Sequence, residues 1–167
     1  MLELNKKTSM DFNNVSFCAG ILNNKDDRFH IHTLQVVFGV MTATDGYRLH
    51  LACVETVPNG YYRVVSKTKS KVILELVAES DVYSYPNVSV VLDQDDECKV
   101  LDCIIDDEMS TVKAHALITK AMDEDECINY RFVSDIAPGD YTVEIRGRKP
   151  VMFINGSRKA AVMPARI

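Results

Sequence analysis

The chain has 167 residues, of which 47% are hydrophobic and 26% are charged, and its formal net charge is −5. This length allows one well-packed core, and the composition excludes disordered and fibrous proteins. The net negative charge argues against nonspecific binding of nucleic acid by the surface as a whole, although it leaves room for a local basic face.

Hydrophobic periodicity in the first half predicts one helix among several strands. Thr8 and Asp11 have the spacing of a capping box ahead of apolar residues at helical intervals, and the polar run 23–27 ends this helix. Alternating apolar and polar residues predict strands on both sides of an Asp45–Gly46 turn. In chain order, the predicted elements are a strand at 1–6, a helix at 9–22, strands at 29–32 and 34–44, and a strand at 47–54.

The second half is predicted to repeat this order of elements. Segment 68–79 is predicted as a helix from its apolar residues at helical spacing, which are Val72, Ile73, Leu76 and Val77. Segment 111–122 fits a helix and a strand about equally, and we assign it to a strand. The other predicted elements are strands at 61–65, 88–93, 99–105, 141–146 and 151–155, an acidic turn at 93–97, and a short β tail after Asn155–Gly156.

Two successive strand–helix–three-strand half repeats therefore make up most of the chain. Runs of antiparallel strands that pack against a small number of helices are typical of the α+β class. We expect an antiparallel sheet with the helices on one face.

Residue patterns for a metal site, a cofactor site or a catalytic centre are missing from the sequence. His30 and His32 lie on one face of a predicted strand, but no third ligand follows at a recognisable spacing. The loop from Asp93 begins like a calcium loop, but Cys98 and Ile104 replace the required Gly and Glu. Neither a Gly-rich phosphate-binding motif nor a nucleophile elbow is found. We therefore expect a protein that is not an enzyme and that binds no metal or cofactor.

The cysteines and the apolar runs indicate the compartment. Five cysteines at irregular spacing are typical of reduced, mostly buried thiols and not of a disulfide framework. The apolar runs are too short to span a bilayer, and the first ten residues lack the apolar segment of a signal peptide. We expect a cytoplasmic protein without a membrane partner.

Two stretches combine residues suited to contact with a partner. TDGYRL, residues 44–49, joins a hydroxyl group, a glycine, an aromatic ring and a guanidinium at a turn. VMPARI, residues 162–167, joins apolar side chains, a proline and an arginine at the end of the chain. On composition alone, both also fit strand ends that pack locally. However, a chain terminus usually frays unless other residues hold it. A tail that stays apolar to its last residue therefore favours contact with a partner.

These two stretches resemble motifs of one family, the bacterial DNA sliding clamp, which is the β subunit of the replicative polymerase. ATDGYRL is similar to the signature A-T-D-G-[HY]-R-L of its middle domain, and VMPARI is similar to its closing residues V-M-P-x-R-[LI]. Segments 15–37, 61–76 and 128–138 resemble further parts of the family, the last of them its P-x-Y-R-x-V-x-P linker. The resemblance implies a clamp fold, which agrees with the predicted half repeats.

The resemblance divides the chain into a clamp-like domain at 1–137 and a C-terminal hairpin and tail at 138–167. The family's chain has three such domains and dimerises into a ring around duplex DNA, whereas this chain has the length of about one. In the family, the two motifs meet in a hydrophobic cleft for peptides of polymerases, the clamp loader and repair factors. The residues implied for the two walls of this cleft are Thr44, Gly46, Tyr47, Arg48 and Leu49, and Val162, Met163, Pro164, Ala165 and Arg166.

Two departures from the family bear on this cleft. Ala165 stands where the family has a larger apolar residue, which implies a wider or weaker pocket. The cleft residues that the family takes from the start of its third domain have no counterpart in this sequence.

Contact with DNA is a further implication of the resemblance. In the family, helices carry lysine and arginine towards the DNA phosphates, an attraction that is independent of sequence and sensitive to salt. Lys67, Lys69 and Lys71 are the candidates for this contact, whereas the predicted helix at 9–22 has no basic residue.

We therefore expect a clamp-like replication factor that binds peptides of the polymerase and of other clamp-associated proteins. It either forms a DNA-encircling homo-oligomer or stays small and competes for clamp-binding peptides. A structural subunit with a degenerate cleft is the alternative from another class.

Overall fold

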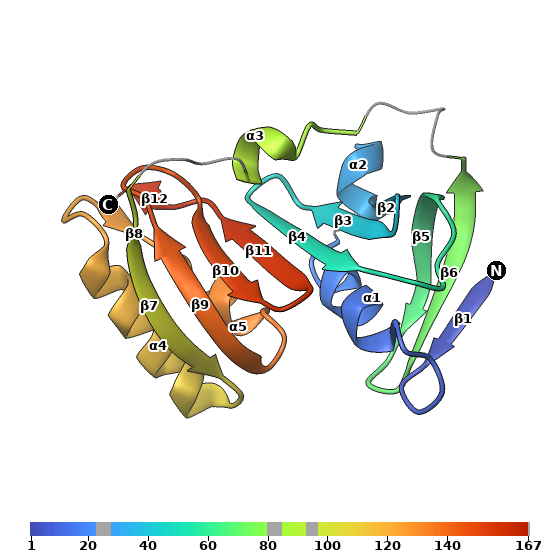
Figure 1. Cartoon of the computed structure of the whole chain (residues 1–167), viewed down its shortest axis with the longest axis horizontal. Helices are drawn as coiled ribbons and strands as arrows, with labels where there is room; N and C mark the ends of the chain where they lie inside the picture. Colours follow the sequence, from blue (N-terminus) through green and yellow to red (C-terminus); the bar gives the residue numbers. More distant parts are fainter. Residues whose placement is uncertain (23–27, 80–84, 93–96, 167) are drawn as a thin grey trace. The chain divides into compact units, whose positions relative to one another are not determined.

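The computed structural model describes residues 1–22, 28–79, 85–92 and 97–166 of the chain (Figure 1). These residues form two units, Met1–Pro86 and Asn87–Ile167, and each unit is described by itself. The predicted polar turn at 23–27 and most of the predicted acidic turn at 93–97 lie outside the described residues.

Six strands of the first unit form an antiparallel arrangement in the order β1-β6-β5-β2-β3-β4. Most of them match the sequence prediction, including the hairpin of β3 and β4 across the Asp45–Gly46 turn. Their bounds are β1 Leu2–Asn5, β2 Thr33–Val37, β3 Val40–Thr44, β4 Arg48–Cys53, β5 Gly60–Lys67 and β6 Lys71–Ala78.

Strand β6 corrects the helix that the sequence predicted at 68–79. Val72 and Leu74 are both buried and Ile73 between them is only half-buried, so the first part of β6 shows the alternation of a strand. Its two neighbours supply the reason, because Leu74 pairs with Leu2 of β1 on one side and with Val64 of β5 on the other. Helical spacing of the apolar residues was therefore overridden by pairing with strands distant in sequence.

Helix α1, Phe12–Ala19, covers one face of this sheet and packs on β3, β4, β5 and β6. It buries Phe12, Val15 and Cys18. The predicted helix at 9–22 is confirmed in its central part, but the predicted capping box is wrong. Asp11 stands at the N-cap without a side-chain capping bond, and its carboxylate binds the chain after β4 instead.

A second short helix, α2 (Phe29–His32), replaces the strand predicted from alternation at 29–32. Its Ile31 is buried, and the helix packs on β2 and β3. Phe29 and Ile31 alternate with two histidines. Four residues are too few to distinguish the two-residue period of a strand from one turn of a helix.

The two-residue turn between β2 and β3 exposes an aromatic side chain. Phe38 has a positive φ of 50°, which is strained for a bulky residue, and its side chain is 91% exposed. The adjacent Gly39 accepts a hydrogen bond from the backbone N–H of Val54 at 2.8 Å.

We expect Gly60→Ala to destabilise the protein by about 1–3 kcal/mol. Gly60 opens β5 with a φ of 147°, and an added Cβ would lie 2.6 Å from Leu76 Cδ1 and 3.1 Å from the carbonyl oxygen of Ala78. Urea unfolding measures the change. Gly20→Ala is the matched control, because Gly20 has an ordinary helical φ of −66° and its nearest neighbour is the flexible end of Lys67. Equal losses in both variants would contradict the expectation.

The second unit has its own antiparallel strands in the order β11-β10-β9-β7, and a separate pair, β12-β8. The predicted hairpin of β9 and β10 and the following turn at Asn155–Gly156 are confirmed. The bounds are β7 Lys99–Ile105, β8 Glu126–Cys127, β9 Gly139–Ile145, β10 Val151–Asn155, β11 Arg158–Val162 and β12 Ala165–Arg166.

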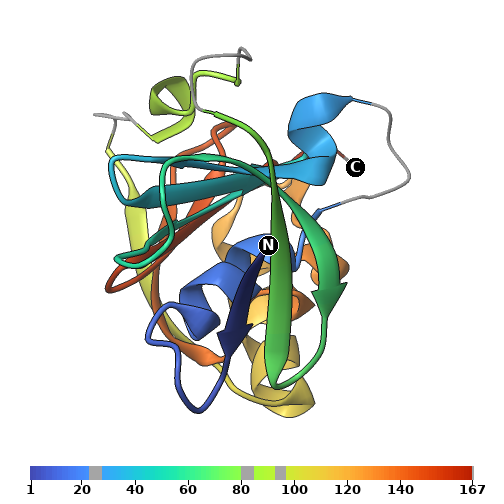
Figure 2. The ribbon, with the colours of Figure 1, turned by 90° about the vertical axis from the view of Figure 1, so that its right-hand side faces the viewer.

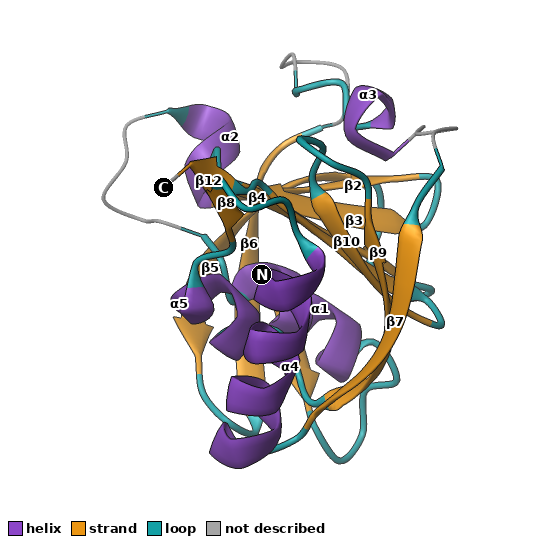
Figure 3. Cartoon of the chain, turned by 90° about the vertical axis from the view of Figure 1, so that its left-hand side faces the viewer, coloured by secondary structure: helices purple, strands orange, loops and turns teal. Residues whose placement is uncertain are grey.

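Helix α4, Glu108–Ala121, corrects the strand that we assigned to 111–122. Asp107 and Ser110 form a capping box: the Asp107 carboxylate accepts from the N–H of Ser110 at 2.7 Å, and the Ser110 hydroxyl accepts from the N–H of Asp107 at 3.0 Å. Ala114 and Ile118 are buried, and the helix packs on β7 and β9. The short helices α3 (Ser89–Leu92) and α5 (Tyr130–Ser134) occupy segments predicted as a strand and as a linker. Figure 3 shows α5 beside α4, with which it packs.

The order strand, helix, antiparallel strands thus occurs once in each unit, as β1-α1 and β7-α4, each followed by further strands. The repeat was predicted, but its second copy begins at β7 and not at residue 61. The boundary expected at residue 137 falls within the second unit, between α5 and β9, and β9 pairs with β7 over seven residues. The α+β class with antiparallel strands is confirmed.

Candidate functional site

The turn between β3 and β4 is fixed by hydrogen bonds from two short polar side chains. The Thr44 hydroxyl donates to the carbonyl oxygen of Arg48 at 2.8 Å and accepts from the N–H of Gly46 at 3.1 Å. Asp45 Oδ1 accepts from the N–H groups of Tyr47 and Arg48, both at 3.0 Å. This arrangement holds the turn in one conformation before any partner arrives.

Tyr47 and Arg48 point to different environments. The Tyr47 side chain is 65% exposed, whereas Arg48 is only 8% exposed and its Nε lies 2.9 Å from Asp45 Oδ2. Leu49 is buried as well. Of the five residues predicted for this wall, Tyr47 and the exposed Gly46 are therefore the ones that the turn presents most openly, and Arg48 has a structural ion pair.

The Ile31 side chain of helix α2 lies close to the turn, a feature that sequence reasoning missed. Gly46 has a φ of 90°, and a Cβ added there would lie 3.7 Å from Cδ1 of the buried Ile31. An aromatic cluster next to α2 was missed too: Phe29 lies 5.4 Å from Tyr61 and Tyr61 lies 6.2 Å from Tyr85, measured between ring centroids. Burial raises the pKa of Tyr85 well above its usual value. The alternation of apolar and polar residues at 29–32 suggested a strand. The aromatic residues themselves were the only sign of this cluster in the sequence.

The tail of the second unit is anchored at both of its ends. Val162 closes β11 and is fully buried, whereas Met163 is 46% exposed. After Pro164, strand β12 pairs with β8 through Ala165↔Cys127 and Arg166↔Glu126 (Figure 1). The expectation that something holds this tail is met within its own unit.

The carboxylate of Glu126, on the strand β8 that pairs with the tail, is buried. Glu126 is 4% exposed, and within the described part of the chain its Oε2 atom has no hydrogen-bond partner. It is the Cα partner of Arg166 in the β12–β8 pair. Position 166 therefore places a basic side chain on the strand next to a buried acid.

The turn belongs to the first unit and the tail to the second. The backbone of each segment is ordered, the turn by its own side chains and the tail by β12. A common cleft between them stays a prediction.

The three lysines predicted to contact DNA lie on a hairpin and not on a helix. Lys67 ends β5, Lys69 lies in the turn, and Lys71 begins β6, where its Nζ is 2.8 Å from Glu3 Oε2. Hydrogen bonds from Lys71 and then from Asn5 lower the pKa of Glu3 below its usual value. The prediction placed these lysines together correctly, but its helical rationale is wrong.

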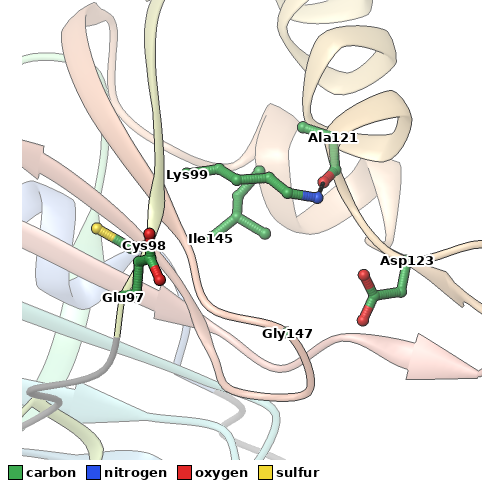
Figure 4. Close-up of a pocket in the computed structure, with 7 residues that line it drawn as sticks. All are labelled: Glu97, Cys98, Lys99, Ala121, Asp123, Ile145 and Gly147. Atoms are coloured by element: carbon green, nitrogen blue, oxygen red, sulfur yellow. Dashed lines mark hydrogen bonds between the residues drawn. The ribbon is translucent and has the colours of Figure 1, made fainter.

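The described residues of the second unit form at least two pockets. The first, of about 280 Å³, contains the half-buried Cys98, and Lys99 Nζ donates to the carbonyl oxygen of Ala121 at 2.7 Å (Figure 4). A cation at the C-terminal end of α4 is favourable. Asp123 lines the same pocket, and Figure 4 shows its carboxylate apart from the Lys99 ammonium. The second pocket, of about 380 Å³, lies at the start of α4 and includes Tyr130.

Candidate ligands for metals do not come together in the described ranges, where no group of three His, Cys, Asp or Glu side chains is arranged to hold an ion. His30 and His32 both lie on α2, with His30 6.4 Å from Tyr85 and His32 5.8 Å from Phe29 between ring centroids. The five cysteines are free, but only Cys18 and Cys103 are buried, so the expectation of mostly buried thiols is wrong. Among the described helices, none combines the length and the hydrophobicity needed to cross a membrane.

Comparison with known proteins identifies the fold. No protein-family model and no curated protein matches the chain. Among solved structures, the DNA polymerase sliding clamp of Pseudomonas aeruginosa is similar with a TM-score of 0.61 and 11% identity, over 99% of this chain and 66% of the clamp. The DNA polymerase III β chain of Streptococcus pneumoniae has a TM-score of 0.64 and 10% identity, over 99% of this chain and 64% of that one. The Helicobacter pylori β clamp bound to a DNA ligase peptide has a TM-score of 0.59 and 9% identity, over 99% and 65%.

These likenesses confirm the sliding-clamp fold expected from the sequence. The chain spans about two thirds of the length of the clamps that it resembles.

Proposed function

We propose that this protein is a non-enzymatic, clamp-like replication factor that binds short peptides through the turn Thr44–Leu49 and the tail Val162–Arg166. The observation that carries the proposal is the exposed Tyr47 ring on a turn that its own side chains hold rigid. An extended peptide needs a preformed surface, because it loses conformational entropy when it binds. The sliding-clamp fold supports the same function, since a fold relative was solved with a DNA ligase peptide.

The tail offers the complementary features. Met163 is a flexible apolar side chain that adapts to different partners, and Pro164 fixes an extended backbone before β12. Arg166 provides a charge that can fix the register of a peptide. Ala165 adds little burial, so we expect a shallower pocket than a larger residue would make.

Two modes of action are compatible with this proposal. In one, several copies encircle DNA, with Lys67, Lys69 and Lys71 near its phosphates. In the other, the protein stays small and competes with a clamp for its peptides. The mass of the protein in solution distinguishes them, because a ring requires several copies and a competitor does not.

We expect Tyr47→Ala to weaken binding of a fluorescein-labelled copy of the DNA ligase peptide by roughly 5–150-fold. A large aromatic anchor at a small interface typically contributes about 1–3 kcal/mol. Phe38→Ala is the matched control, because it also removes an exposed aromatic ring from the first unit, but outside the turn. Fluorescence anisotropy measures both affinities.

The outcomes separate the proposals. Equal weakening in both variants would show that Tyr47 has no special role. If the wild-type protein does not bind the peptide, the structural-subunit alternative is favoured.

A further inference from the structure

Two loops of the first unit meet at one end of its sheet. The loop between β1 and α1 contains Lys6 and Lys7, and the turn between β5 and β6 carries Lys67, Lys69 and Lys71. The backbone N–H of Lys6 donates to the carbonyl oxygen of Ser70 at 2.9 Å, so the loops are side by side. Figures 1 and 2 both show them together at the lower end of the unit. We name these five lysines the basic loop pair.

Local hydrogen bonds hold both loops in place. Asn5 brackets the first loop: its carbonyl oxygen accepts from the N–H groups of Thr8 and Ser9, at 3.1 and 2.9 Å, and its N–H donates to the Ser9 hydroxyl at 3.0 Å. In the second loop, the Thr68 hydroxyl accepts from the N–H of Lys71 at 3.0 Å. The lysines therefore project from an ordered backbone, which lowers the entropic cost of binding.

The charge of the basic loop pair is opposite to that of the protein. Five lysines gather in a chain whose formal net charge is −5. Lys71 forms an ion pair with Glu3. The Nζ of Lys67 lies near Gly20, just after α1, where an added Cβ would be 3.1 Å from it. Over the residues that the structure describes, Lys6, Lys7 and Lys69 form no ion pair. Like charges held close together repel each other, so Lys6, Lys7 and Lys69 add repulsion to the folded unit.

We infer that the basic loop pair binds the phosphate backbone of duplex DNA, with Lys6 and Lys7 as full contributors and Glu3 as a built-in competitor for Lys71. The inference rests on the proposed DNA contact of Lys67, Lys69 and Lys71, and it extends that contact to a second loop. Glu3 Oε2 lies 2.8 Å from the Nζ of Lys71, and Glu3 Oε1 accepts a hydrogen bond from Asn5 Nδ2 at 3.2 Å. A phosphate that approaches Lys71 is repelled by this carboxylate and shares the donors of the ammonium with it.

Duplex DNA fits this surface better than other anionic partners. A cluster of lysines without an apolar side chain among its five members attracts an anionic chain by charge alone, and duplex DNA carries the densest regular array of such charge. The five residues are lysines, which bind phosphate as point charges without base recognition, and such contacts are independent of sequence. The row of phosphates along a duplex suits several lysines that project from two neighbouring ordered loops.

The test is titration of a labelled 30-base-pair duplex at several salt concentrations, followed by fluorescence anisotropy. We expect K6E/K7E to weaken binding at least tenfold and to reduce the slope of log K against log salt by about 2, because each lost phosphate contact removes about 0.9. Glu3→Gln should strengthen binding about two- to fivefold, as expected when an exposed ion pair no longer competes. K149E/K159E makes the same charge change in the second unit and should have a smaller effect. Circular dichroism verifies that every variant is folded.

Each result decides between the proposals. If K67E/K69E/K71E weakens binding but K6E/K7E does not, the inference is overturned while the contact of the three hairpin lysines stands. If neither variant weakens binding, or if the wild-type protein ignores duplex at 50 mM salt, both are overturned, whereas the peptide-binding proposal stands on its own titration. Binding of poly-glutamate or of phosphatidylserine vesicles as tightly as duplex would overturn the assignment to nucleic acid.

Discussion

Removal of residues 163–167 is expected to weaken binding of the labelled DNA ligase peptide by at least tenfold and to leave the fold intact. A tenfold change in affinity corresponds to about 1.4 kcal/mol, which is within the contribution of one or two anchor residues. The deletion removes Met163, which is half exposed, and the proline that fixes the backbone after it.

The fold should survive this deletion because the tail contributes little to the core. Val162 is the last fully buried residue of β11 and is retained, and β12 is bound to β8 by only two residue pairs. We expect the midpoint of thermal unfolding to fall by less than about 4 °C, or roughly 1 kcal/mol for a chain of this size. Met163→Ala in the full-length chain is the companion variant, and Lys159→Ala on β11 is the control.

Three results would count against the tail as a binding wall. Equal affinities for the full and shortened chains would place the peptide elsewhere. Loss of the cooperative unfolding transition would show that the tail is structural, and the affinity of Met163→Ala then decides its role. Equal weakening by Met163→Ala and Lys159→Ala would indicate a nonspecific effect.

Substitution of Asp11 by alanine is expected to destabilise the protein by about 2–4 kcal/mol. The Asp11 side chain is 3% exposed, and its carboxylate accepts from the N–H and the hydroxyl of Thr56, both at 2.6 Å, and from the N–H of Glu55 at 3.0 Å. These bonds tie the start of α1 to the connection between β4 and β5. Alanine would remove the acceptor of all these hydrogen bonds.

Asp11→Asn is the matched variant, because it retains one acceptor oxygen but no charge. Hydrogen bonds to a charged acceptor are about twice as strong as neutral ones, so we expect an intermediate loss of stability at pH 7. Urea unfolding of all three proteins gives the comparison. An alanine variant as stable as the wild type would show that the carboxylate network contributes nothing.

The same carboxylate makes stability depend on pH. Burial opposes ionisation of Asp11, but the hydrogen bonds from Thr56 and Glu55 outweigh it and hold the pKa of Asp11 below its usual value. A lowered pKa in the folded state stabilises the protein above the unfolded value of about 3.9. This stabilisation is lost as pH falls through the lower, folded-state value. The difference in unfolding free energy between the wild type and Asp11→Asn should therefore shrink below about pH 4, and a constant difference would contradict this assignment.

Local sequence patterns predicted the hairpins but not every helix. The turn residues at Asp45–Gly46 and Asn155–Gly156 fix short connections, and the strands beside them were found where expected. Segment 71–78 was missed because its choice of structure depends on β1, about 70 residues earlier in the chain. Segment 108–121 offered a local signal in Asp107 and Ser110, which a search for serine-containing capping boxes would have found.

The candidate site was predictable to the extent that it lies in contiguous motifs. The exposed Tyr47 and the held tail follow from short stretches of sequence, whereas the burial of Arg48 depends on the ion pair with Asp45 and on the rest of the fold. The basic loop pair could not be found in this way. Lys6 and Ser70 are far apart in sequence, and only the pairing of β1 with β6 brings their loops together.

The pairing of β1 with β6 also constrains how the protein folds during its synthesis. Leu4 cannot form its strand pair until Val72 has left the ribosome, because these two residues are partners in the sheet. At synthesis rates of about 5–20 residues per second, this interval lasts roughly 3–14 s. The hairpin of β3 and β4 is complete well before that time, but its neighbouring strands close the sheet only with the arrival of β5 and β6. The apolar face of α1 therefore stays open to chaperones until almost half of the chain has been made.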